Sequence, residues 1–211
     1  MVKATALLNN NTLLLPDIDL ALTQLTGVIS YGENGLTAKG LKAKVLNDKA
    51  LIDIASKQSS TVISLNGELD TDTLAKKYPN DLWQKITGRT SSLVKVTVPL
   101  FSAEGSADTI IELKSNLQGV VVDLPSPTGK VKATKADFNA QLKLSSGDVP
   151  VQFSYADKAQ GQLLFKRNKA AGLSLERGDV HLGTGTARLP ENPGVRLSGR
   201  IPSIHVEEWI N

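Results

Sequence analysis

Apolar and polar residues alternate in short segments along nearly the whole chain. In one such segment the apolar positions are Phe138, Ala140, Leu142 and Leu144, with polar residues between them. Residues 149–155 repeat the pattern. A period of two is typical of a β-strand that has one apolar face and one polar face. The chain is therefore expected to be rich in strands of this kind.

Turn signals separate these segments at close spacing. Gly32-Glu33-Asn34-Gly35 contains Asn-Gly, which favours a primed hairpin turn, and Asn47-Asp48 marks another turn. Closely spaced strands joined by short turns form an antiparallel meander. The expected strands are residues 2–8, 25–31, 36–46, 50–55, 61–65, 93–101, 138–144, 149–155, 162–167, 172–176, 179–182 and 195–201.

The stretch of residues 111–130 divides the chain near its middle. Its first half alternates like a strand, but its second half is an apolar run, Val120 to Val122, followed by Pro125 and Pro127. Prolines cannot donate the hydrogen bonds that a central strand needs. A strand is therefore expected to stop here.

Helical character is expected in two places only. Residues 70–86 begin with acidic capping residues and carry lysines before Pro79, and Ser203 offers a cap near the C-terminus. A Leu-(Asn/Ser)-Gly-x-(Leu/Ile) sequence precedes each place, at residues 65–69 and 197–201. This weak repeat would divide the chain into units 1–88 and 89–211.

The apolar faces of so many strands need a covering layer, and the predicted helices are too few to supply it. The pattern alone favours a β-sandwich or barrel in which the sheet covers itself. The alternative is an open, curled sheet whose apolar face forms a groove. Either way the fold class is mainly β, an antiparallel meander with one or two short helices.

Composition narrows the classes of function. The chain has 211 residues, 40% hydrophobic and only 4% aromatic, so its core is aliphatic. It has no cysteine, and therefore neither a disulfide framework nor a thiolate metal site. The net charge of +3 is mild and the lysines are scattered, which argues against a nucleic-acid partner. No run of residues is apolar for long enough to span a membrane or to act as a secretory signal.

No catalytic constellation stands out. His181 and His205 lie far apart without cysteine nearby, so we expect no metal site and no cofactor. The acidic pairs Asp17/Asp19 and Asp70/Asp72 fit a strand and a helix cap better than a catalytic dyad, and no serine lies in a Gly-x-Ser-x-Gly elbow. We expect that the protein is not an enzyme.

The second half of the chain carries motifs of a known family. Residues 116–130, Asn-Leu-Gln-Gly-Val-Val-Val-Asp-Leu-Pro-Ser-Pro-Thr-Gly-Lys, resemble the Leu-Pro-x-Pro-x-Gly-Lys signature of the YhdP type of AsmA-like proteins. Motifs beginning at Arg177, Ala187 and Gly194, and then Glu208-Trp209, resemble later family motifs in the same order. The distinctive part covers about residues 110–209, whereas the first half fits as repeated strands.

This resemblance implies a segment of a large envelope protein of Gram-negative bacteria. Such a protein is anchored in the inner membrane, and its β-sheets curl into a hydrophobic groove that carries phospholipids across the periplasm towards the outer membrane. The whole chain, 1–211, would then be one β-rich fragment of a repeat-built protein. Its truncated C-terminal helix and missing targeting signal fit that expectation.

The expected partners of such a fragment are phospholipid acyl chains, neighbouring repeats of the parent chain and, through the parent, both membranes. The candidate groove residues come from the best-patterned strands. A β-sandwich interaction module or an envelope scaffold without a lipid ligand would have the same alternation and remains open. The candidates are Leu142, Leu144, Val151, Phe153, Leu163, Phe165, Leu173 and Leu175.

Overall fold

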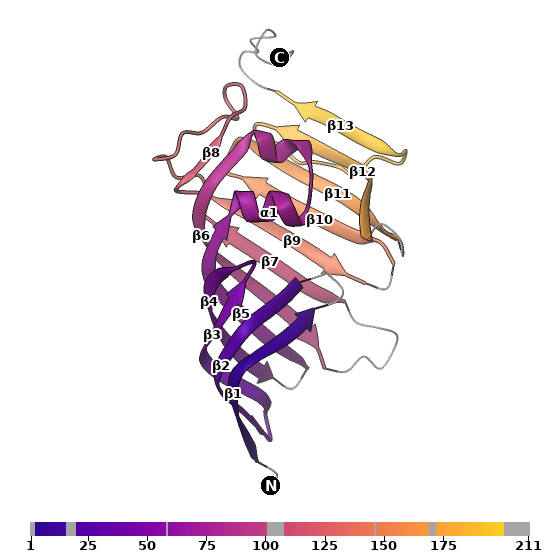
Figure 1. Cartoon of the computed structure of the whole chain (residues 1–211). Helices are drawn as coiled ribbons and strands as arrows, with labels where there is room; N and C mark the ends of the chain where they lie inside the picture. The colour runs from indigo at the N-terminus through magenta and orange to yellow at the C-terminus, as the bar shows by residue number, and fades with distance from the viewer. Residues whose placement is uncertain are drawn as a thin grey trace.

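A computed structural model describes residues 3–15, 20–57, 59–100, 108–145, 147–168 and 172–200. In this part of the chain the strands form one sheet of 13, and each strand pairs with the next along the path β1-β2-β3-β4-β5-β6-β7-β9-β10-β11-β12-β13, while β8 pairs with β6 (Figure 1). The strands are β1 (Ala4–Leu15), β2 (Leu20–Gly32), β3 (Gly35–Val45), β4 (Asp48–Lys57), β5 (Ser60–Asp70), β6 (Ile86–Pro99), β7 (Thr109–Ser115), β8 (Val120–Val122), β9 (Phe138–Leu144), β10 (Val149–Tyr155), β11 (Ala159–Asn168), β12 (Gly172–Leu182) and β13 (Gly194–Gly199).

The predicted fold class is confirmed. All pairs along the path are antiparallel except β12 and β13, which run parallel. The sheet is open, because β1 and β13 stand at opposite ends of the path. It is also curled, so that β1 and β2 pass in front of the strands behind them (Figure 1). A closed barrel is therefore wrong for the described residues, and no second sheet packs on this one to make a sandwich.

Most strands are longer than the alternation predicted. Residues 172–176 and 179–182 were expected as two strands, but they form the single strand β12, with a register shift opposite Leu164 and Phe165. The sheet also gains a short strand, β8, from the run at Val120 that was expected only to end a strand. The prolines that follow lie outside the strands, as predicted.

The hairpin turns differ from the prediction in their type. Gly32 pairs with Gly35, so the β2–β3 hairpin is present, but Glu33 and Asn34 have negative φ angles and the turn is not a primed one. The turn between β3 and β4 instead has positive φ at Leu46 and Asn47, at 50° and 71°. A primed type I turn requires positive φ at both central residues. The primed geometry therefore lies one hairpin later than expected.

Helix forms within residues 70–86, where the sequence predicted it. Helix α1 (Thr71–Lys77) begins at Asp70, whose side chain accepts a hydrogen bond from the backbone N–H of Asp72, and it ends with two lysines. A 3₁₀ turn, η2 (Asp81–Gln84), follows. None of the described helices is long and apolar enough to cross a membrane. The helix expected after Ser203 lies outside the described residues, so the repeat units 1–88 and 89–211 remain a prediction.

The connection between β12 and β13 crosses the polar side of the sheet and is tied down by one buried carboxylate. Asp179 is 1% exposed and accepts hydrogen bonds from Arg196 Nε at 3.1 Å and from the backbone N–H of Arg188 at 2.8 Å. The hydrogen bond from Arg196 is the main reason that the pKa of Asp179 falls to about 2. This pair holds the parallel edge strand in place.

The lowered pKa of Asp179 predicts how stability depends on pH. The ionised carboxylate stabilises the folded state above its unfolded pKa near 4, and that contribution is lost as pH falls towards 2. The shift corresponds to about 2 kcal/mol. Urea unfolding at several pH values should therefore show a loss of stability between pH 4 and pH 2 that is smaller in Asp179→Asn. An equal acid-dependent loss in both proteins would contradict this assignment.

Candidate functional site

One face of the sheet is apolar across every strand of the path. Strand registers place one residue from each strand in a single row, and every member of the row is aliphatic or glycine. A neighbouring row from β3 to β13 is also apolar, with Phe153 as its aromatic member. The first row is Ala6, Ile29, Ala38, Ile54, Ile63, Val96, Ile111, Leu142, Val151, Leu163, Gly178 and Val195; the second is Leu41, Ile52, Leu65, Val94, Leu113, Ala140, Phe153, Gly161, Val180 and Leu197. We call this surface the apolar face.

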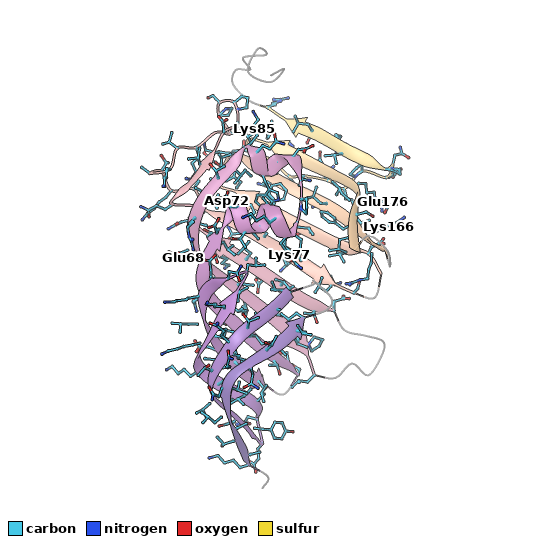
Figure 2. The ribbon with its side chains drawn as sticks, viewed as in Figure 1. Glu68, Asp72, Lys77, Lys85, Lys166 and Glu176 are labelled. Atoms are coloured by element: carbon cyan, nitrogen blue, oxygen red, sulfur yellow. The ribbon has the colours of Figure 1, made fainter. Side chains whose placement is uncertain are left out.

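The opposite face carries the polar partners of these strands. Adjacent strands form ion pairs there, including Lys95 with Glu112 at 3.4 Å and Lys143 with Asp108 at 2.8 Å. Lys166 of β11 pairs with Glu176 of β12, and both lie near the right-hand end of these strands in Figure 2. These ion pairs thus lie on one side of a single-layered sheet, and the other side is left mainly for apolar contacts.

The eight residues selected from the sequence all lie on the apolar face. Leu142, Val151 and Leu163 occupy one row of directly paired positions. Phe165 pairs with both Val149 and Leu175, so it shares that face. The remaining members follow by alternation along their own strands: Leu144, Phe153 and Leu173. Whether a ligand contacts them remains a prediction.

Two glycines make room for large side chains on this face. The ring of Phe153 lies over Gly161, where an added Cβ would come within 1.9 Å of it. The side chain of Leu163 covers Gly178 in the same way, at 2.4 Å. Phe153 also stacks on Phe138, with ring centroids 6.2 Å apart. Large side chains therefore lie down along the sheet here.

Exposure of the apolar face changes along the sheet. In the curled half, Leu22, Leu41 and Ile52 are no more than 2% exposed and form a cluster with side chains from β5, supported by β1 and β6. In the second half the row members of β9 to β11 other than Gly161 are half-buried. At the end of the path, Leu175 is 44% exposed and Leu197 is 58% exposed. The face is thus filled by its own side chains near β3 and β4, and again where Ile111, Leu144 and Val149 are at most 8% exposed, and it opens towards β13.

Residues 116–137, which the sequence pattern did not place, cover one end of the apolar face. Between β7 and β9 the chain leaves the sheet, and Val120, Val122 and Ala136 pack against Tyr155, Ala159 and Leu182 in a buried cluster. The last three residues lie at the ends of β10, β11 and β12. We call residues 116–137 the covering segment; its β8 lies at the upper left in Figure 1.

Polar contacts fix the covering segment to the sheet. Tyr155 donates a hydrogen bond through its hydroxyl to the backbone oxygen of Thr128 at 3.0 Å, and Lys158 Nζ donates to the backbone oxygens of Pro127 and Gly129. Lys130 Nζ donates to the backbone oxygen of Val120 at 2.6 Å. Burial, and then the nearby charge of Lys158, lowers the pKa of Lys130. Lys158 thus binds carbonyl groups of the proline turn and Lys130 binds one of β8, so the Leu-Pro-x-Pro-x-Gly-Lys motif has a structural role.

A cavity of about 400 Å³ lies at the same end of the strands in the curled half. Leucines of β1 and β2 line it together with the β3–β4 turn and Lys77, from the last turn of α1. Helix α1 and the covering segment thus both lie at the strand ends where β5 finishes and β6 begins.

The described residues contain no group of acidic or histidine side chains that could hold a metal ion. His181 Nδ1 lies 3.0 Å from the Ser198 hydroxyl, on the polar face of β12, which is paired on both sides and is not an edge strand. His205, Glu207, Glu208 and the Asp17/Asp19 pair lie outside the described residues. The expectation that the protein is not an enzyme remains a prediction.

Arg167 also lies on this face, although the sequence pattern did not mark it as a candidate. It continues the alternation of Leu163 and Phe165 along β11, and it pairs with Leu173 of β12. That continuation was visible in the sequence, but residues 162–167 were treated as a strand that ends at a charged residue. Its place at the margin of an apolar surface became evident only with the register.

Comparison with known proteins gives one family. The family model described as "YhdP protein" matches residues 1–211, the whole chain. The chain is 25% identical to the "Intermembrane phospholipid transporter YhdP" of Escherichia coli (strain K12) over 215 aligned residues. The match covers 99% of this chain but only 16% of that relative. No solved structure matches.

Proposed function

The chain belongs to the YhdP family, and from that premise we propose that it is a periplasmic segment of a lipid transport protein anchored in the inner membrane. In this proposal phospholipid acyl chains lie on the apolar face while they move between the inner and the outer membrane. The observation that carries the proposal is the unbroken apolar row from β1 to β13. The relative's name, an intermembrane phospholipid transporter, supports the choice of ligand.

The free energy of acyl-chain burial on the apolar face suits passive transport of lipid. Each CH₂ group of an acyl chain that leaves water for an apolar surface gains about 0.8 kcal/mol. Leu142, Val151, Phe153 and Leu163 are half-buried without a lipid, so they can gain contacts when one arrives. Because the rows hold no hydrogen-bonding side chain, an acyl chain meets no polar group as it slides from strand to strand.

In this proposal the part of the apolar face that lipid can reach is the second half of the sheet. Leu41 and Ile52 are each 1% exposed, so the apolar face near them has no room for an added chain unless the curl opens. Leu163 and Phe165 lie beyond that region, where the exposed fraction rises towards Leu175. We therefore place bound acyl chains across β9 to β13.

The same proposal implies that strands of neighbouring repeats pair with the two edges of this sheet. The relative is far longer than this chain, and β1 and β13 each pair with a single strand among the described residues. Unpaired strand edges readily accept another strand. In the parent protein, neighbouring repeats would continue the sheet at both edges and lengthen the apolar face.

A scaffold without a lipid ligand is the second candidate. The cluster around Leu41 and Ile52 favours it, because there the sheet packs against itself as an ordinary core does. This candidate predicts that the half-exposed residues of β9 to β11 contact another protein segment instead of lipid. The two candidates differ in whether the isolated chain carries lipid.

Native mass spectrometry of the purified chain separates them. After incubation with vesicles of bacterial phospholipids, we expect a population whose added mass equals that of a phospholipid and which yields that lipid on extraction. The control is the same protein incubated without vesicles and delipidated. A chain that stays free of lipid at every vesicle concentration would reject the transport proposal and leave the scaffold.

A further inference from the structure

Charge is almost absent from the apolar face, with one exception. Among the described positions of β5 to β13 whose register or alternation places them on this face, Arg167 is the one charged side chain. Its neighbours on the same face are Phe165, two residues earlier, and Leu173, directly opposite on β12. An arginine placed among leucine and phenylalanine side chains joins a cationic group to an apolar surface.

The two ends of the strands differ in what they can accept. At the end that holds Tyr155 and Ala159, the covering segment packs on the apolar face and buries it. Arg167 lies at the other end of β11, where it is exposed, and Leu173 beside it is 38% exposed. At the Arg167 end the face is also closed on β9 and β10, by Leu144 and Val149, and is open on β11 and β12. A ligand on β11 and β12 would therefore keep its polar end on the side of Arg167.

We propose that Arg167 contacts the phosphate of a glycerophospholipid whose acyl chains lie on Leu163, Phe165 and Leu175. Guanidinium groups bind phosphate oxygens through paired, charge-assisted hydrogen bonds. The arrangement orients each lipid along the strands, with its headgroup at the Arg167 end and its acyl chains towards the covering segment. This site rests on the proposed function, because it names the headgroup contact for the same apolar face.

The test separates the phosphate contact from the acyl-chain contact. The full chain is loaded either with palmitoyl-oleoyl phosphatidylglycerol or with palmitoyl-oleoyl glycerol, which has the same acyl chains but no phosphate, and bound lipid is quantified by native mass spectrometry. We expect Arg167→Gln to lower the affinity for phosphatidylglycerol about threefold to tenfold, the effect of one charged contact at an exposed site. Its affinity for the diacylglycerol should not change, and Arg167→Lys should restore part of the loss.

Two control variants locate the effect. Lys166→Gln removes the same charge from the next residue, which lies on the polar face and pairs with Glu176. Lys77→Gln removes a cation from the cavity at the opposite strand ends. Both should bind either lipid as the wild type does. A loss in Lys77→Gln with none in Arg167→Gln would overturn the proposal and place the headgroup at the other end.

The remaining outcomes are equally decisive. If Arg167→Gln weakens both lipids alike, or neither, the residue has no phosphate contact and the proposed transport function stands without it. If millimolar inorganic phosphate displaces phosphatidylglycerol from the wild type, the arginine binds free phosphate and no lipid-specific site exists. If the wild type captures neither lipid, the proposed function itself fails and this site fails with it.

Discussion

Replacing Ile52 with alanine should destabilise the protein by about 2 to 5 kcal/mol. Ile52 is 1% exposed and packs in the curled half between Leu41 and Leu65, its partners on the neighbouring strands. Removing its side chain leaves a cavity that the pleated sheet cannot fill without moving strands. The effect should be among the largest of any alanine substitution in this chain, because the side chain is both large and fully buried.

The adjacent residue supplies the matched control. Leu51 lies on the polar face of the same strand and is 53% exposed. Leu51→Ala should change stability by less than about 0.5 kcal/mol. Urea unfolding followed by tryptophan fluorescence and by circular dichroism would measure both variants. Similar losses in the two would show that the curled half is not packed as described, and that the apolar face is open along its whole length.

The strands with the strictest alternation were the ones predicted best. Phe138–Leu144 and Val149–Tyr155 have the predicted bounds, because each is a short strand whose pattern is entirely local. β1 was predicted to end at Leu8 but runs to Leu15 through three asparagines. Asn10 there has a φ of 56°, and the register shifts between Leu8 and Asn11. Asparagine tolerates that conformation, so a bulge carries the strand past the break in the pattern.

The rows of the apolar face could not be predicted from the pattern of single strands. Alternation shows that Leu142 and Phe153 each lie on an apolar side, but not which residues stand opposite them. That depends on register, which is set by turns such as Leu46-Asn47, whose positive φ at a leucine has no clear sequence signal. The family resemblance, confirmed over the whole chain, supplied the groove hypothesis that local pattern left open.

The position of the covering segment also could not be predicted from the local sequence. Its prolines correctly predicted that a central strand would stop, yet nothing in the local sequence said that the segment would fold back over Tyr155 and Ala159. The contacts that hold it join residues about 30 positions apart, such as Lys158 with Gly129. Long-range hydrogen bonds from lysine to backbone carbonyls have no periodic signature.

Placing a carboxylate on the open half of the apolar face should abolish lipid capture while the protein still folds. Phe153 and Leu142 are half-buried, so an aspartate at either position can reach water and avoids the cost of a fully buried charge. The same charge would repel lipid phosphate and remove apolar contact area. We expect Phe153→Asp and Leu142→Asp to lose about 1 to 2 kcal/mol of stability, the range of ordinary substitutions, and nearly all bound phospholipid.

The matched control is Gln152→Asp, because Gln152 precedes Phe153 on the same strand and lies on the polar face, opposite Gln141 and Gln162. It introduces the same charge at the same place in the sheet but on the other side. It should fold as the wild type does and bind as much lipid. A loss in this variant would mean that added negative charge alone, on either face, prevents binding.

Thermal unfolding and photo-crosslinking to a diazirine phospholipid, applied side by side to the wild type, Phe153→Asp, Leu142→Asp and Gln152→Asp, test directly whether acyl chains lie on the open half of the apolar face. We expect four folded proteins, of which only the wild type and Gln152→Asp crosslink lipid. Two results would contradict it: unfolded Phe153→Asp and Leu142→Asp, which would make the face a closed core, or folded variants that capture lipid as well as the wild type.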